Sequence, residues 1–331
     1  MDGLKSVKKH FSKIGLMFFL GTLIIYATQI IPIVIIRLVR PEWITHPDIS
    51  IIISVLPLYL VGMPILICLV KKVPAIRLEH RKMTPGAFAV AAIMCFAVMY
   101  ISNIAGNMLT VIIGLLKGEA VQNVVMQMTS DTSLWVIILY MVICAPVMEE
   151  YVFRKLIVDR AAVYGEGVAV LLSGLMFGLF HGNLNQFVYA FALGVFLAYL
   201  YVKTGNLKIT IALHMMINFV GGFISTVLLR VINIEEMEAA LSNADMQVIM
   251  DYVANNAGGI VAYALFSIFV FGMMIAGTVL LIVNFSRQKF WLAQGEVQIP
   301  KGKKFTTVML NVGMLLYSIF WIGMIVAQLL A

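Results

Sequence analysis

The sequence predicts an all-α, polytopic transmembrane helix bundle, and three observations support this prediction. The 331 residues are 62% hydrophobic and only 12% charged, whereas an ordinary soluble domain is about 25% charged. The mean hydropathy is +1.01. The apolar residues are gathered in runs of about 20, the length that a helix needs to cross a hydrocarbon core. These observations exclude a soluble enzyme, a disordered regulator and a nucleic-acid-binding domain, so no nucleic acid is expected as a partner.

We expect about eight or nine spanning helices. Apolar runs of spanning length lie near residues 14–36, 50–70, 87–116, 133–155, 166–182, 186–202, 208–229, 259–284 and 307–330. The third run is long enough to tilt or to hold a break at Gly106. The first run is too long for the core of a signal peptide, so we expect it to be the first spanning helix.

The positions of the basic residues predict the orientation. With the N-terminus in the cytoplasm and the spans alternating, nearly all of the 23 Lys and Arg residues fall in cytoplasmic segments. The exceptions are Arg37, Arg40, Lys117 and Arg230. Cytoplasmic loops collect Lys and Arg, which favours this orientation. We therefore expect a multi-pass protein of the cell membrane, with the lipid bilayer as its surroundings and a bacterial plasma membrane as its location.

The chain is expected to form one integral membrane domain in three regions. Residues 1–130 supply N-terminal spanning helices, 131–230 the core that carries the chemistry, and 231–331 an extracytoplasmic helix followed by C-terminal spanning helices. The acidic stretch 234–251 is predicted to be a surface helix or a lid. Asn233, with Glu236 three residues later, forms a capping-box pattern at its start.

The chemistry is expected where ionisable residues interrupt the apolar spans, because charge in the hydrocarbon is costly and is usually functional. Only two of the 16 acidic residues, Glu149 and Glu150, lie within a span. Only two of the five histidines, His181 and His214, do so. Arg154 follows Glu150 by one helical turn, which is a favourable spacing for an ion pair.

The same residues are expected to lie at one depth. A helical hairpin that turns near Gly165 places Glu149 and His181 at equal distances from the turn, and His214 enters on a third helix. Charged residues around the turn predict that its tip protrudes into the cytoplasm; they are Asp159, Arg160 and Glu166. The segment after His181 leaves only a short turn before the next helix.

Three short motifs carry a resemblance to a known family. They are Glu149-Glu150-Tyr-Val-Phe-Arg154, Phe177-Gly-Leu-Phe-His181 and His214-Met-Met-Ile-Asn218. They resemble the EExxxR, FxxxH and HxxxN motifs of the CPBP family, which includes the type II CAAX prenyl endopeptidases and bacteriocin-processing membrane proteases. The resemblance covers roughly residues 130–230.

The resemblance implies an intramembrane endopeptidase that hydrolyses a peptide bond near the cytoplasmic leaflet. In the family's glutamate mechanism, the residue that matches Glu149 is the general base on a water also held by His181. His214 and Asn218 match the pair that stabilises the oxyanion. The supporting positions are Glu150, Arg154 and Phe177. The implied partner is a peptide or membrane-protein substrate, and no cofactor is expected.

Four alternatives stay open at this point. Glu149, His181 and His214 could instead bind zinc as a two-His, one-carboxylate site, although the HExxH signature is absent. The polar residues could be a buried network that only fixes helix packing. The protein could be a proton-coupled transporter, for which inverted repeats would be expected but are not seen. It could also be a non-catalytic bacteriocin-immunity or scaffold protein. The oligomeric state is left open.

Overall fold

The computed structural model describes residues 2–243 and 245–330, and within these ranges the fold is helical with no β-strand. Its only β-type pairing there is an isolated bridge between Gly165 and Gln294. Eight helices are long and apolar enough to cross a membrane. They are Gly3–Val39, Pro47–Val70, Pro85–Lys117, Leu134–Tyr164, Leu184–Thr204, Leu207–Val231, Ala257–Ser286 and Val312–Leu330. The prediction of an all-α, multi-pass membrane protein is confirmed.

The helices follow one another with few long connections. The N-terminal helices are α1 (Asp2–Val39), α2 (Pro47–Pro57), α3 (Met63–Val70), α4 (Pro85–Lys117) and α5 (Val124–Thr129). The central helices are α6 (Leu134–Ile137), α7 (Ala145–Glu149), α8 (Asp159–Ala161), α9 (Glu166–Phe180), α10 (Leu184–Thr204), α11 (Leu207–Ile217) and α12 (Ser225–Val231). The C-terminal helices are α13 (Ile234–Asn243), α14 (Met246–Asn255), α15 (Ala257–Ser286), α16 (Lys304–Val308) and α17 (Val312–Leu330).

Several spans are composite helices that contain π-helical segments. These segments are η2 (Leu58–Gly62), η3 (Ile138–Cys144), η4 (Glu150–Val158) and η6 (Asn218–Ile224). Short 3₁₀ turns lie at η1 (Pro41–Trp43) and η5 (Ala162–Tyr164). π-Helical turns are rare and are frequent at functional sites. Three of the four segments lie on the two spans that carry Glu149, Glu150, His214 and Asn218.

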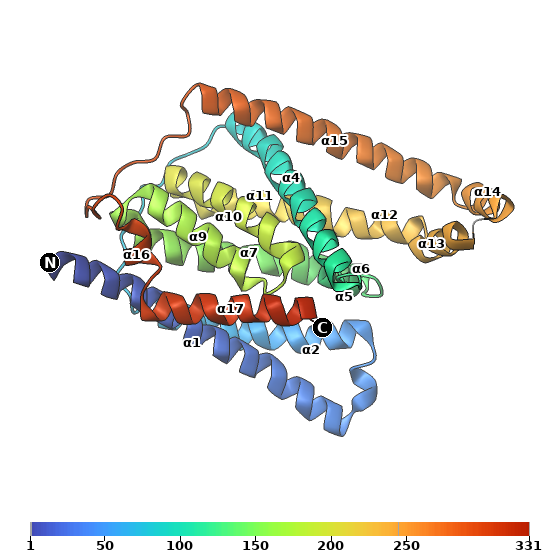
Figure 1. Cartoon of the computed structure of the whole chain (residues 1–331), viewed down its shortest axis with the longest axis horizontal. Coiled ribbons are helices and arrows are strands. Elements are labelled where there is room, and N and C mark those ends of the chain that lie inside the picture. Colours follow the sequence, from blue (N-terminus) through green and yellow to red (C-terminus); the bar gives the residue numbers. More distant parts are fainter. Residues whose placement is uncertain (1, 244, 331) are drawn as a thin grey trace.

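Figure 1 shows how the helices are arranged. Helices α1, α2 and α17 lie together on one side, and α1 packs along α17, so the first and last spanning helices are neighbours. Helices α4 and α15 pack against each other on the opposite side. Between them lie α7, α9, α10 and α11, and α10 packs against α9, α4 and α11. The helices that carry the three motifs therefore lie in the middle of the bundle.

Helix α9 is the ninth expected span, and it is shorter than a full crossing. Its 15 residues (Glu166–Phe180) rise about 22 Å, less than the hydrocarbon thickness. The last span also begins later than expected, at Val312, because α16 ends at Val308 and a turn separates the two helices. Eight spans with one shorter apolar helix therefore agree with the predicted number.

The long helix α4 has clear ends and no break. Thr84 caps its start by accepting a hydrogen bond from the Ala87 amide at 3.2 Å, and Gly118 ends it at φ +83°. Gly106 lies inside a continuous helix, so the break considered at this residue is not present. A Cβ on Gly106 would lie 3.3 Å from Val188 and 3.5 Å from the Asn185 carbonyl oxygen. Gly106 therefore serves the close approach of α4 to α10.

Glycines also set the spacing of α9 and α10. A Cβ on Gly174 would lie 2.8 Å from the Val195 amide nitrogen, and one on Gly178 would lie 3.0 Å from the Phe187 carbonyl oxygen. Small residues spaced in this way allow helix backbones to approach closely in membranes. The connection between the two helices is as short as expected, with Gly182 at φ +64°. This tight hairpin fixes the position of His181 at its bend.

The chain turns near Gly165 as predicted, and the charged residues around the turn are packed against neighbouring segments; its protrusion into the cytoplasm stays a prediction. Asp159 and Arg160 are only 4% and 5% exposed. The Arg160 guanidinium donates to the carbonyl oxygens of Val70 and Leu156, both at 3.0 Å. Glu166 accepts from Lys203 at 2.5 Å and from the Ala293 amide at 2.7 Å. The charged side chains around the turn therefore bind neighbouring segments of the protein.

The acidic stretch forms two helices, α13 and α14, where one was expected. The predicted N-cap is present, because the Asn233 side chain accepts from the Glu236 amide at 3.4 Å. The capping box is incomplete: the Glu236 carboxylate accepts from the Asn233 side chain at 2.9 Å, and the Asn233 backbone amide donates to the Arg230 carbonyl oxygen instead. Asp245 caps the second helix by accepting from the Gln247 amide at 2.9 Å. A second cap signal therefore divided the stretch.

Candidate active site

Glu150 and Arg154 form an ion pair that is closed to solvent. Arg154 Nε lies 3.0 Å from Glu150 Oε2, and both side chains are 0% exposed. Arg154 Nη1 also donates to Ser173 Oγ at 3.1 Å, and its guanidinium carbon lies 4.6 Å from the centre of the Phe177 ring. This is the one-turn pairing that the spacing predicts. Because Arg154 neutralises it, Glu150 remains an ionised hydrogen-bond acceptor inside the bundle.

His214 lies between the two glutamates. Its side chain is buried, and Nδ1 lies 3.0 Å from Glu150 Oε1. An ionised carboxylate only accepts, so Nδ1 carries the hydrogen of this bond. The other ring nitrogen, Nε2, lies 3.8 Å from Glu149 Oε2. Glu149 and Glu150 thus face the same residue through different ring nitrogens, where the helix geometry had predicted different neighbours for them.

His181 is held by its own helix. It ends α9, and its Nδ1 lies 2.9 Å from the carbonyl oxygen of Phe177. A carbonyl oxygen only accepts, so Nδ1 is the protonated nitrogen and Nε2 of the neutral ring keeps its lone pair. The Phe177 ring meets His181 edge to face at 4.8 Å and His214 at 5.8 Å. Phe177 therefore fixes the orientation of both imidazoles.

Asn218 binds the neighbouring π-helical segment. Its Nδ2 donates to the Met141 carbonyl oxygen at 2.8 Å, which joins η6 to η3. A primary amide carries two hydrogens, so one remains for another acceptor. Among the described residues no hydrogen bond joins Asn218 to His214, or Glu149 to His181. The structure thus places Glu149 next to His214 and Phe177 against both imidazoles, with Asn218 one helical turn after His214.

A zinc site would need Glu149, His181 and His214 to converge on one point. In the described ranges, no group of three or more His, Cys, Asp or Glu side chains is placed to hold a metal ion. Both imidazoles use Nδ1 in hydrogen bonds, which leaves only their Nε2 atoms for another contact. Zinc-binding imidazoles also donate their second nitrogen to a carboxylate or carbonyl oxygen, so the zinc alternative stays an untested prediction.

Sequence reasoning missed several polar residues around the site. Ser173 accepts from Arg154 and donates to the Phe153 carbonyl oxygen at 2.8 Å, so it links α9 to η4. Because Ser173 is a polar residue one turn before Phe177 in an apolar helix, the sequence could have indicated that it belongs to the site. Three side chains of the α10 N-terminus form a hydrogen-bonded chain next to His181; they are Asn183, Gln186 and Tyr189. Their spacing of three residues was the corresponding signal.

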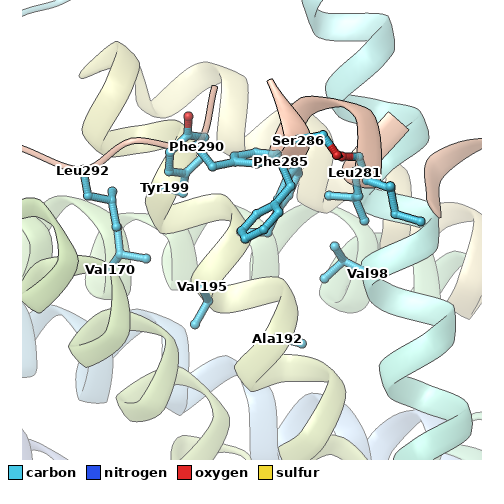
Figure 2. A pocket seen from close by; sticks show the side chains of 12 residues that line it. Val98, Val170, Ala192, Val195, Tyr199, Leu281, Phe285, Ser286, Phe290 and Leu292 are labelled. Atoms are coloured by element: carbon cyan, nitrogen blue, oxygen red, sulfur yellow. The ribbon is translucent and has the colours of Figure 1, made fainter. Parts of the chain in front are cut away.

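A cavity among the described residues lies elsewhere. It holds about 520 Å³ and is bounded by apolar side chains of α4, α9, α10 and α15. Figure 2 shows Val195 and Ala192 of α10 on one wall and Phe285 of α15 on the other. None of the residues named by the three motifs lines it. Nothing in the structure shows what occupies it.

Comparison with known proteins identifies the central segment. Residues 131–220 match the model of the family described as type II CAAX prenyl endopeptidase Rce1-like. All three motifs fall within this range. No solved structure matches.

Two curated relatives are bacterial membrane proteins. The membrane-embedded CAAX protease MroQ of Staphylococcus aureus (strain USA300) is 32% identical over 117 residues, which cover 33% of this chain and 45% of that protein. A candidate membrane peptidase, YdiL of Bacillus subtilis (strain 168), is 27% identical over 126 residues, covering 37% of this chain and 50% of that protein. The chain thus spans about half the length of the curated relatives it matches. The resemblance seen in the three motifs is confirmed for residues 131–220, which carry the Rce1-like region of this multi-pass membrane protein.

Proposed function

We propose that this protein is an intramembrane endopeptidase in which Glu149 is the general base. The observation that carries the proposal is the position of His214, between Glu149 and the sealed Glu150–Arg154 pair. A packing network has no need to place one imidazole between two carboxylates with its second nitrogen unbonded. The match of residues 131–220 to the endopeptidase family supports the same reaction.

The proposed reaction uses a doubly protonated His214. Its Nδ1 hydrogen is committed to Glu150, so a donor at Nε2 requires a second proton. Glu149, 3.8 Å away, is then the counter-ion of an imidazolium ring. In this state Glu149 is a carboxylate, which is the form that a general base needs.

The reaction then proceeds by water attack. Glu149 takes a proton from a water that also donates to the lone pair on His181 Nε2. The hydroxide oxygen bonds to the carbonyl carbon of the scissile peptide, and the carbonyl oxygen becomes an oxyanion. His214 Nε2–H and the second Asn218 N–H donate to this oxyanion. Glu149 next gives its proton to the leaving amine as the C–N bond breaks.

The charges remain balanced throughout these steps. When Glu149 becomes neutral, the positive charge of His214 loses one counter-ion and gains another in the oxyanion. The negative charge moves across His214 instead of appearing alone in a medium of low dielectric, where an unpaired charge is costly. The Glu150–Arg154 pair stays fixed and keeps the ring in place.

The proposed substrate is a peptide or membrane protein whose scissile bond enters the bundle near the end at which Lys and Arg gather. The name of the matching family suggests a C-terminal peptide that bears a prenyl group. The reaction as proposed requires no cofactor.

The test compares cells that carry the wild-type chain with cells that carry Glu149→Gln. We expect a precursor to accumulate in the membrane proteome of the variant, with cleavage of the purified precursor reduced by about 10²–10⁴-fold. The matched control is Glu238→Gln, the same change on α13 outside the site, which should leave the proteome unchanged. An unaltered proteome in Glu149→Gln cells, with the variant folded and inserted, would refute the proposal and favour a scaffold or immunity role.

A further inference from the structure

The N-terminus of α10 contains a directed chain of hydrogen bonds. Asn183 caps the helix by accepting from the Gln186 amide at 2.9 Å. Its Nδ2 donates to the His181 carbonyl oxygen at 2.9 Å and to Gln186 Oε1 at 2.7 Å. Gln186 Nε2 donates to the Tyr189 hydroxyl at 3.1 Å. The chain therefore begins at His181 and ends at Tyr189.

The direction of these bonds determines what Tyr189 offers. Its oxygen accepts from Gln186, so its own hydrogen must point to another acceptor. Among the described residues, no acceptor for this hydrogen lies within hydrogen-bond distance. The hydroxyl oxygen is therefore held by Gln186, and the hydroxyl hydrogen is free to donate to a ligand or a water.

Tyr189 lies on α10, eight residues after His181. Helix α10 packs against η4, the segment that begins directly after Glu149. No direct hydrogen bond joins the Tyr189 hydroxyl to Glu149, and the two groups lie close enough to interact electrostatically. Two polar groups beyond direct reach are commonly joined by a water. Tyr59 also lies within range of the Glu149 charge, but no hydrogen bond among the described residues orients its hydroxyl.

The nucleophilic water of the proposed reaction needs such a donor. It donates one hydrogen to Glu149 and the other to His181 Nε2, and both groups only accept. A water has two lone pairs, one of which must point to the scissile carbonyl carbon. We propose that the Tyr189 hydroxyl donates to the other lone pair and is a further catalytic residue that holds the attacking water. This inference rests on the proposed function of Glu149.

The position suits a tyrosine. A hydroxyl that donates to water lowers the freedom of the water without placing another charge in the bundle, as a lysine would. The bond from Gln186 orients the hydroxyl, and Asn183 orients Gln186 relative to the bend that carries His181. The same series of hydrogen bonds thus positions the donor Tyr189 and the acceptor His181 for one water.

Two measurements on the full-length protein test the inference. In cleavage of the precursor that accumulates in Glu149→Gln cells, Tyr189→Phe should lower kcat about tenfold and leave KM unchanged, because the lost bond acts on the water and not on the peptide. Gln186→Leu should lower kcat in the same direction. The matched control is Tyr199→Phe, on the same helix, whose hydroxyl donates to the Lys289 carbonyl oxygen at 3.0 Å.

The second measurement needs no substrate. The infrared difference between the wild type and Glu149→Gln isolates the carboxyl band of Glu149. We expect this band to shift in Tyr189→Phe and to stay in place in Tyr199→Phe, with the thermal unfolding of both variants like that of the wild type. An unshifted band overturns the inference, as does a loss of activity that appears in KM alone. If Glu149→Gln still cleaves, the proposed function fails, whereas the band shift still decides whether Tyr189 acts on Glu149 through water.

Discussion

Removing the charge of Arg154 is expected to be the most destabilising single change around the site. Arg154→Met keeps the length and apolar character of the side chain but removes the guanidinium. The variant loses the ion pair with Glu150, the bond to Ser173 and the contact with Phe177. It also leaves a carboxylate without its partner in a place closed to solvent.

The magnitude follows from these contacts. A hydrogen bond from a charged donor, such as that from Arg154 to Ser173, contributes about 1.5–3 kcal/mol, and a desolvated cation–π contact about 2 kcal/mol. Leaving Glu150 without a counter-ion lowers the stability only by the cost of protonating it, because the carboxylate can take up a proton rather than remain charged. Protonating an ordinary glutamate at pH 7 costs about 3.7 kcal/mol. His214 recovers part of this by remaining bound to Glu150. We therefore expect a net loss of about 3–5 kcal/mol, in the range seen when one partner of a buried pair is removed.

A double-mutant cycle provides the assay. The free energy of unfolding is measured by steric trapping in lipid micelles for the wild type, Arg154→Met, Glu150→Gln and the double variant. Glu150→Gln keeps an acceptor for His214, so the double variant should lie within about 2 kcal/mol of the wild type. The deficit of Arg154→Met should also shrink as the pH falls from 7 to 5, because a neutral Glu150 needs no counter-charge. Equal stability of Arg154→Met and the wild type, or additive effects without coupling, would refute the reasoning.

Three further changes have expected outcomes. Gly174→Ala should lower the free energy of unfolding by about 1–3 kcal/mol, because the added Cβ would meet the backbone of Val195. The control in the same unfolding assay is Gly167→Ala, which should change the free energy little. Its Cβ would lie 3.6 Å from a flexible leucine methyl. Asp48→Asn should speed amide hydrogen exchange in residues 124–133 about tenfold. The Asp48 carboxylate accepts hydrogen bonds from the Ser133 amide at 2.6 Å and from the Ser133 hydroxyl at 2.5 Å, and the variant weakens both. Unchanged exchange would contradict this prediction. Metal analysis of the purified, active protein should find zinc well below one ion per chain and full activity after chelation, and stoichiometric zinc that turnover requires would overturn the metal-free reaction.

Much of the fold could be predicted because the bilayer imposes it. A chain in hydrocarbon must satisfy its backbone hydrogen bonds within each helix, so the length of an apolar run predicts a span almost directly. The same constraint isolated Glu149, Glu150, His181 and His214 as exceptions within those runs. The pairing of Glu150 with Arg154 followed from one helical turn of spacing.

The remaining features depend on contacts between distant parts of the chain. The fixed spacing of 3.6 residues gives no sign of the π-helical segments η3, η4 and η6, which change how Glu150 and Asn218 face their neighbours. The bond from Asn218 to Met141 joins residues 77 positions apart. The burial of Arg160 depends on the Val70 carbonyl oxygen, on a helix far away in sequence. Local pattern does not encode such contacts.

The hydrogen-bonding capacity that the network leaves unused favours a reaction centre over a packing device. In a network that only joins helices, donors and acceptors would be satisfied within the protein, because unpaired polar groups are costly in a membrane. Here most outer groups are satisfied: Glu150, Arg154 Nε and Nη1 and both histidine Nδ1 atoms have partners, whereas Arg154 Nη2 has none among the described residues. The inner capacity is open, at His181 Nε2, His214 Nε2, one Asn218 hydrogen and the Tyr189 hydrogen. The open set contains both donors and acceptors, as a water and a peptide carbonyl would require.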